Sequence, residues 1–117
     1  MTEGLQSPAG KTQAAVAALW ERFAEKFFER LSLLERTCDA LRKGNLNEEL
    51  HREAVTAAHK LAGSLGTFGL GRGSKLAEEM ESLLDAGNLR DPARSARLAE
   101  LADNLRKELE QGPPPPA

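Results

Sequence analysis

Residues that build β-sheets are scarce in this chain of 117 residues. It contains no isoleucine and no tyrosine, and only two valines and five threonines. β-Branched and aromatic residues favour strands, whereas leucine and alanine, which dominate here, favour helices. A chain of this length can bury one modest hydrophobic core but not two. The composition therefore predicts a single all-α domain.

Other absences narrow the function. One cysteine excludes an internal disulfide, and two distant histidines with that cysteine do not make a zinc site. The 16 basic and 18 acidic residues are spread along the chain without a basic block, which argues against nucleic acid as the main partner. No secretory signal and no run long enough to span a membrane is present. We therefore expect a cytoplasmic protein without a metal or a membrane contact, and we take it to be a monomer.

Four segments show the period of amphipathic helices. Asn47 is an N-cap signal for the second segment, and Asp91 with Pro92 opens the fourth. The segments cover residues 11–43, 47–68, 72–87 and 91–111. Their short connections predict an antiparallel up-and-down four-helix bundle. The first segment, which begins at residue 11 or 12, carries the bulkiest apolar stripe, made of Val16, Trp20, Phe23, Phe27, Leu31, Leu34, Cys38 and Leu41.

The two ends of the chain differ in composition from the bundle. Residues 1–10 mix Ser, Pro and Gly without periodicity, which predicts a flexible N-terminal arm. Gly112 and the four prolines after it predict a Pro-rich, disordered tail over residues 112–117. The bundle itself is thus assigned to residues 11–111.

His59 lies in the second helical segment, on the side away from its apolar residues. At 100° per residue, His59 falls roughly 160° from the centre of the apolar stripe. Ala62, Gly63 and Gly66, one and two turns on, leave that side of the helix nearly bare. Glycine inside a helix costs about 1 kcal/mol relative to alanine. We interpret the bare strip as access for another protein's active site to the imidazole.

The stretch that starts at His59 resembles the phosphotransfer motif of histidine-containing phosphotransfer (HPt) domains. That motif has a histidine, a lysine three residues on, a glycine at four, a small residue at five and a glycine at ten. Gly63, Ser64 and Gly69 match these places, and Ala62 stands where the family has its lysine. The resemblance implies a four-helix bundle with an exposed histidine in the middle of a helix.

By this resemblance, the chain carries a phosphoryl group in a two-component phosphorelay. His59 is expected to take the group from the aspartyl phosphate of a response-regulator receiver domain and to pass it on, with a histidine kinase as a further candidate partner. In this family, Mg²⁺ and the acidic pocket belong to the receiver, so the chain itself is expected to be no enzyme and to need no cofactor. The family lysine is thought to neutralise the phosphoryl group. Arg72 and Lys75 are the candidates to replace it, because Lys60 lies about 100° round the helix.

Partner contacts are expected on the same face as the histidine. The candidate binding residues are Lys60, Ala62, Gly63, Ser64 and Gly66, and by helical angle Arg52, Thr56 and Thr67 lie near that face.

Two other functions stay open. A docking module that binds a receiver or a kinase without carrying phosphate fits the missing lysine at Ala62. A structural helical bundle would expose an apolar interface patch, whereas the face around His59 is small and polar. His51 stands among glutamates and is expected at the surface without a function. Cys38 falls on an apolar face and is expected to be a core residue.

Overall fold

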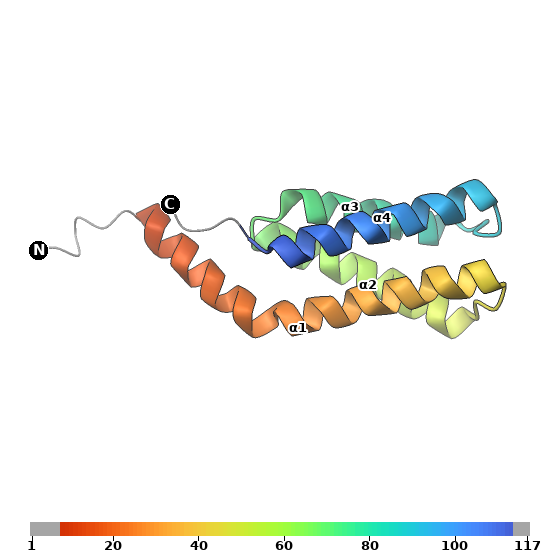
Figure 1. Cartoon of the computed structure of the whole chain (residues 1–117), viewed down its shortest axis with the longest axis horizontal. Helices are drawn as coiled ribbons and strands as arrows, with labels where there is room; N and C mark the ends of the chain where they lie inside the picture. Colours follow the sequence, from red (N-terminus) through yellow and green to blue (C-terminus); the bar gives the residue numbers. More distant parts are fainter. Residues whose placement is uncertain (1–7, 114–117) are drawn as a thin grey trace, which may run out of the picture.

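The computed structural model describes residues 8–113, and their side chains from residue 14 onward. These residues form four α-helices and no strand, which confirms the predicted all-α fold. The helices are α1 (Pro8–Lys43), α2 (Glu48–Thr67), α3 (Gly71–Ala86) and α4 (Pro92–Gln111), as Figure 1 shows.

α1 begins at Pro8, so it takes in residues 8–10, which composition alone assigns to the arm. Proline fits the first turn of a helix because the amide hydrogen that it lacks would have no helical partner there. Residues 1–7 and 114–117, where the rest of the arm and most of the tail were predicted, lie outside the described residues.

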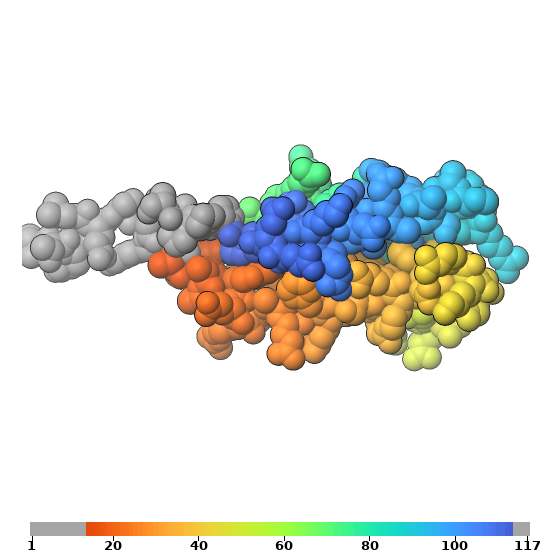
Figure 2. All heavy atoms as spheres, viewed as in Figure 1, coloured from red at the N-terminus to blue at the C-terminus, as the bar shows by residue number. Residues whose placement is uncertain are grey.

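The helices pack in a closed ring of neighbours. Each contacts the next along the chain, and α1 also contacts α4. Side chains fill the boundary between α1 and α4 in the space-filling view (Figure 2). The molecule is long and narrow, 63 × 21 × 19 Å, because α1 has 36 residues and the others have 16 to 20. The first part of α1 runs at an angle to the rest of that helix and reaches past the bundle (Figure 1).

The core is built mainly from leucines that all four helices contribute, and alanines let α2 approach its neighbours closely. Ala54, Ala57 and Ala58 are buried on α2. Aromatic rings close one end of the core, where the ring centroids of Trp20 and Phe27 lie 5.7 and 5.4 Å from that of Phe68. The fully buried large side chains are Leu31, Leu34, Thr37, Leu61, Leu65, Met80, Leu84, Leu98, Leu101, Leu105 and Leu109.

Phe23 departs from the predicted core. Its side chain is 44% exposed, and Leu19 one turn earlier is 41% exposed. The physical reason is that both side chains line an open hollow between α1 and α2, which the side chains of the two helices do not fill. Cys38, by contrast, packs against the core as predicted, and burial raises the pKa of its thiol to about 11.

Capping side chains begin α2 and α4 where the sequence predicts. Asn47 accepts a hydrogen bond from the amide of Leu50 at 2.8 Å, and Asp91 accepts one from Ala93 at 3.0 Å. Such caps satisfy amide groups that have no partner within the helix. Gly69, between α2 and α3, has a φ of +78°, which a residue with a side chain adopts only with strain. The chain can therefore turn back sharply and lay α3 along α2.

Candidate functional site

His59 stands on the surface of α2, well away from both ends of the helix. Its side chain is 73% exposed, which agrees with the helical angle that separates it from the core residues. Gly63, one turn on, is also exposed, and a Cβ built on it would meet no atom within 4 Å. Packing within this molecule therefore does not require a glycine at that position. The bare strip next to His59 leaves room for something outside the molecule.

Glu81 of α3 is the nearest partner of His59. The imidazole Nδ1 lies 2.9 Å from the Glu81 carboxylate oxygen Oε2. An ionised carboxylate only accepts hydrogen bonds, so Nδ1 carries the proton and donates it. The other ring nitrogen, Nε2, is then the one with a free lone pair. This pairing selects one tautomer and directs the lone pair of Nε2 away from Glu81.

The sequence reasoning missed Glu81. The turn at Gly69 could have indicated that Glu81 lies near His59. His59 is ten residues before that glycine and Glu81 is twelve residues after it. Two helices that fold back about a turn bring together residues at nearly equal distances from it. Counting outward from the turn would have named Glu81 as a neighbour, although not the ring nitrogen that it contacts.

Ala62 lies at the contact between α2 and α3. Its side chain is half-buried, and its carbonyl oxygen accepts a hydrogen bond from the Ser74 hydroxyl at 2.6 Å. The candidates for the missing lysine are elsewhere. Arg72 lies 3.9 Å from Glu108 of α4, and Lys75 lines a shallow hollow formed by α3 residues. These placements do not support either residue as a substitute for the lysine beside His59.

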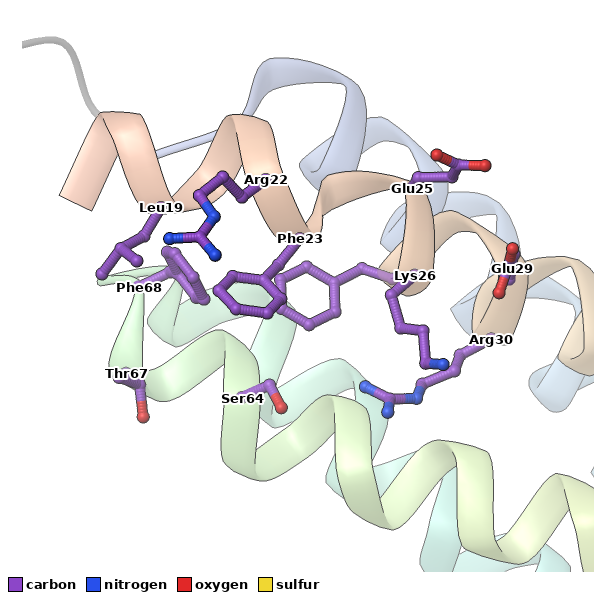
Figure 3. A pocket seen from close by; sticks show the side chains of 11 residues that line it. Leu19, Arg22, Phe23, Glu25, Lys26, Glu29, Arg30, Ser64, Thr67 and Phe68 are labelled. Carbon is purple, nitrogen blue, oxygen red and sulfur yellow. The ribbon is translucent and has the colours of Figure 1, made fainter. Parts of the chain in front are cut away.

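The other predicted contact residues divide between two sides of α2. Gly66 faces α3, where a Cβ on it would lie 3.6 Å from the Ser74 hydroxyl oxygen. Ser64 and Thr67 face α1 and line a hollow of about 810 Å³ between the two helices (Figure 3). Lys60 lines a smaller hollow on that same side. The predicted residues thus surround the exposed strip rather than forming one cluster.

His51 differs from the prediction of an idle surface residue. It is half-buried, and its Nε2 lies 2.6 Å from the carbonyl oxygen of Leu84 in the last turns of α3. A ring N–H that donates there satisfies a backbone acceptor near a helix end. His51 therefore ties α2 to α3. The helical pattern could not show this, because the contact depends on how α3 lies against α2.

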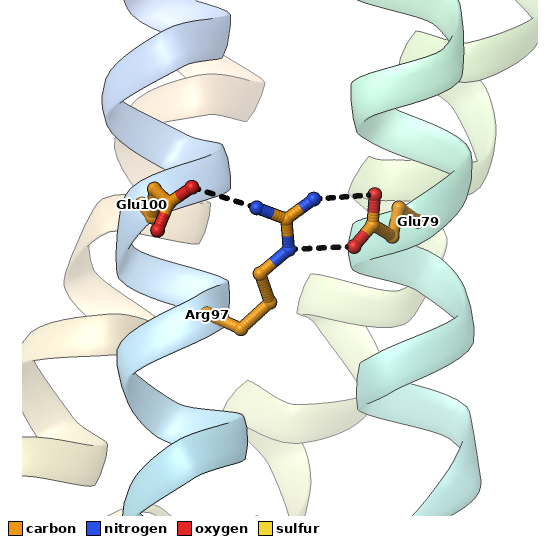
Figure 4. A network of polar contacts seen from close by, with 3 residues as sticks. All are labelled: Glu79, Arg97 and Glu100. Atoms are coloured by element: carbon orange, nitrogen blue, oxygen red, sulfur yellow. Dashed lines mark hydrogen bonds and ion pairs between the residues drawn. The ribbon is translucent and has the colours of Figure 1, made fainter.

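Acidic and basic side chains also connect α3 and α4 on a surface away from His59. Arg97 of α4 donates two hydrogen bonds to Glu79 of α3, at 2.7 and 3.0 Å, and one to Glu100 at 2.7 Å (Figure 4). The hydrogen bond from Arg97 lowers the pKa of Glu79. All three residues are exposed, so the network contributes little to stability.

No group of three or more His, Cys, Asp and Glu side chains among the described residues could hold a metal ion. Within the same part of the chain, every helix is too short or too polar to cross a membrane.

Comparison with known proteins agrees with the geometry of this site. The family model of the Hpt domain matches residues 18–111, which include all of α2, α3 and α4 and most of α1. The chain belongs to the Hpt domain family. Such domains are phosphotransfer modules of two-component systems, and in general they carry phosphoryl groups rather than catalyse reactions. Comparisons with curated proteins and with solved structures gave no match.

Proposed function

We propose that this Hpt domain accepts a phosphoryl group on Nε2 of His59 from the aspartyl phosphate of a receiver domain and passes it to a second acceptor. The observation that carries the proposal is the exposed His59 whose Nδ1 is held by Glu81 at 2.9 Å. The proposal takes the four helices as an antiparallel up-and-down bundle. In support, His51, His59 and Ala62 of α2 contact Leu84, Glu81 and Ser74 of α3, so that residue numbers fall along one helix as they rise along the other.

The transfer needs one bond to form and one to break. The lone pair of Nε2 attacks phosphorus in line, the N–P bond forms, and the bond between phosphorus and the aspartyl oxygen breaks to release a carboxylate. The ring gains positive charge as the bond forms, and the Glu81 carboxylate on Nδ1 stabilises that charge. Mg²⁺ is expected on the receiver, where it would neutralise the phosphoryl oxygens. The domain supplies the nucleophile and the docking surface.

Docking must bring the receiver's aspartyl phosphate within reach of the imidazole. The strip at Gly63 offers space for this approach, since apart from the adjacent backbone of α2 no atom lies within 4 Å of the position a Cβ would take. The domain is proposed to act in the cytoplasm as a monomer. Receivers would dock on this face of α2, and a histidine kinase is a further candidate partner for the same face.

Ala62 favours one second candidate function. Ala62 offers no charge one turn from His59, so a phosphoryl group on Nε2 would lack the lysine that the family places there. A domain with this site could bind receivers without keeping a phosphoryl group. Such a docking module needs the same exposed face but not the nucleophile.

A transfer assay with phosphorylated receiver domains distinguishes the two functions. The chain has two histidines, so His51→Gln is the matched control for His59→Gln. We expect acid-labile, base-stable label on the wild type and on His51→Gln, and none on His59→Gln. Receiver binding by titration without any label would support the docking module instead. Label that persists in His59→Gln would contradict both the nucleophile and the site.

A further inference from the structure

A groove runs along the boundary between α1 and α2, beside His59. Its most voluminous part is the hollow of about 810 Å³ near Phe68. Two further hollows continue it toward the middle of α2. The second hollow shares Lys26 and Arg30 with the first, and the third shares Arg30 and Leu33 with the second. We call the whole feature the α1–α2 groove, defined by Leu19, Arg22, Phe23, Lys26, Arg30 and Leu33 of α1 and by Arg52, Lys60, Ser64, Thr67 and Phe68 of α2.

Basic side chains outnumber acidic ones along this groove, whose acidic lining residues are Glu25, Glu29 and Glu53. None of its five Lys and Arg side chains forms an ion pair with a described carboxylate, whereas Arg97 and Arg106 on other faces do. Glu25 and Glu29 border the groove but point away from α2, while Lys26 and Arg30 reach toward α2 (Figure 3). Free cations of this kind favour an acidic partner.

The cations of α1 follow the repeat of the helix. Arg22, Lys26 and Arg30 are spaced four residues apart, so they recur about every 6 Å along the axis. A second helix that lies alongside α1 presents one side chain per turn, about every 5.4 Å, along the facing row. Carboxylates at three- and four-residue intervals on such a helix would each meet one cation.

Apolar side chains lie at one end of the same groove. Leu19 and Phe23 are among the large hydrophobic residues left exposed, and the ring of Phe23 lies 6.5 Å from that of Phe68. A partner needs apolar side chains to cover them. Duplex nucleic acid would satisfy the cations but not these residues, because its bases are already stacked, and a flat membrane surface would not fill a concave groove. An amphipathic helix satisfies both requirements.

We propose that the α1–α2 groove binds an acidic amphipathic helix of the protein that docks on this domain, with glutamates or aspartates on Arg22, Lys26 and Arg30 and an apolar residue against Leu19 and Phe23. That this partner also exchanges the phosphoryl group rests on the proposed function. Binding of the helix in the groove does not depend on it. The groove sets which partner docks, and His59 receives the group.

A synthetic helical peptide tests the groove directly. The probe carries glutamates every four residues on one side and leucines on the adjacent side, and a second peptide has lysines in place of the glutamates. Trp20 reports binding by its fluorescence, because it is the only tryptophan and its ring contacts Phe68. We expect the acidic peptide to bind at least tenfold more tightly than the basic one, and salt to weaken it.

Charge-reversal variants locate the binding site. Lys26→Glu with Arg30→Glu changes the groove, and Lys75→Glu with Lys107→Glu makes the same change of net charge on α3 and α4 outside it. We expect about tenfold weaker binding for the groove pair and a change within twofold for the control pair. Equal effects of the two pairs, or equal binding of the two peptides, would overturn the proposal. Tighter binding of a duplex oligonucleotide or of phosphatidylserine vesicles through Lys26 and Arg30 would also overturn it.

The same variants separate this proposal from the proposed function. If receivers label His59 equally in the wild type and in Lys26→Glu with Arg30→Glu, the phosphotransfer role stands and the groove proposal fails. If the acidic peptide binds in the groove but no receiver labels His59, the groove proposal stands and the phosphotransfer role fails.

Discussion

Nδ1 of His59 lies 2.9 Å from Oε2 of Glu81, so that a residue of α3 fixes the tautomer of a histidine on α2. The carboxylate side chain is 30% exposed and the imidazole 73% exposed, which leaves the pair accessible to a partner. A surface hydrogen bond of this kind adds little to stability, and its effect is to place the proton of the neutral ring on Nδ1. In the proposed transfer, Nε2 then carries the lone pair that attacks phosphorus.

Replacing Glu81 by Gln should slow phosphorylation of His59. The amide oxygen can still accept from Nδ1, but the charge that stabilises the developing imidazolium is lost. We expect on the order of tenfold slower transfer, equivalent to about 1.4 kcal/mol. Glu81→Ala, which also removes the acceptor, should be slower still. The measurement is the single-turnover rate of phosphoryl transfer to His59 in each variant. Unchanged rates in both variants would exclude a role for Glu81.

Gly63 allows a test of access that is separate from folding. Gly63→Ala and Gly63→Leu should both keep or raise the free energy of unfolding, by up to about 1 kcal/mol, because the helix loses a glycine and the new Cβ meets no atom. Only the leucine is large enough to obstruct a partner over His59. Transfer should therefore fail in Gly63→Leu and persist in Gly63→Ala. Normal transfer in Gly63→Leu would show that the bare strip is not the approach path.

Ala62→Lys restores the residue that the family has at this position. Its ammonium group would lie one turn from the phosphorylated ring and offset the charge of Glu81. We expect a longer half-life of the phosphohistidine, by about threefold to tenfold for an exposed pair. Ala96→Lys, on an exposed position of α4, adds the same charge elsewhere and should leave the half-life unchanged. Equal half-lives in all three proteins would mean that the lysine does not act through charge at this site.

His51 should matter for stability and not for transfer. Its Nε2 lies 2.6 Å from the Leu84 carbonyl oxygen, so His51→Ala removes a half-buried hydrogen bond between α2 and α3. We expect a loss of about 1 kcal/mol in the free energy of unfolding, measured with urea, and unchanged labelling of His59. A variant as stable as the wild type would show that this contact contributes nothing in solution.

Sequence patterns were informative wherever local chemistry decides the structure. Asn47 and Asp91 begin helices because their side chains cap amides two or three residues away. His59 is exposed because its helical angle is opposite to the buried leucines of the same helix. Both features need only a few neighbouring residues, and so both could be predicted from the sequence alone.

Features that depend on how helices meet could not be predicted in this way. Phe23 has the spacing of a core residue, but it lines an open hollow between α1 and α2. Glu81 and Leu84 become partners of the two histidines only when α3 folds back along α2. Each of these contacts joins residues more than twenty positions apart, where helical periodicity carries no information.

The position of the phosphoryl group after transfer from a phosphorylated receiver domain decides whether Nε2 of His59 is the acceptor. Protein with ¹⁵N-labelled histidine shows by phosphorus–nitrogen coupling which ring nitrogen bears phosphorus. We predict one signal, coupled to Nε2 of His59, and its loss in His59→Gln. Phosphorus on Nδ1, or on His51, would contradict the role given to Glu81 and to the exposed face of α2.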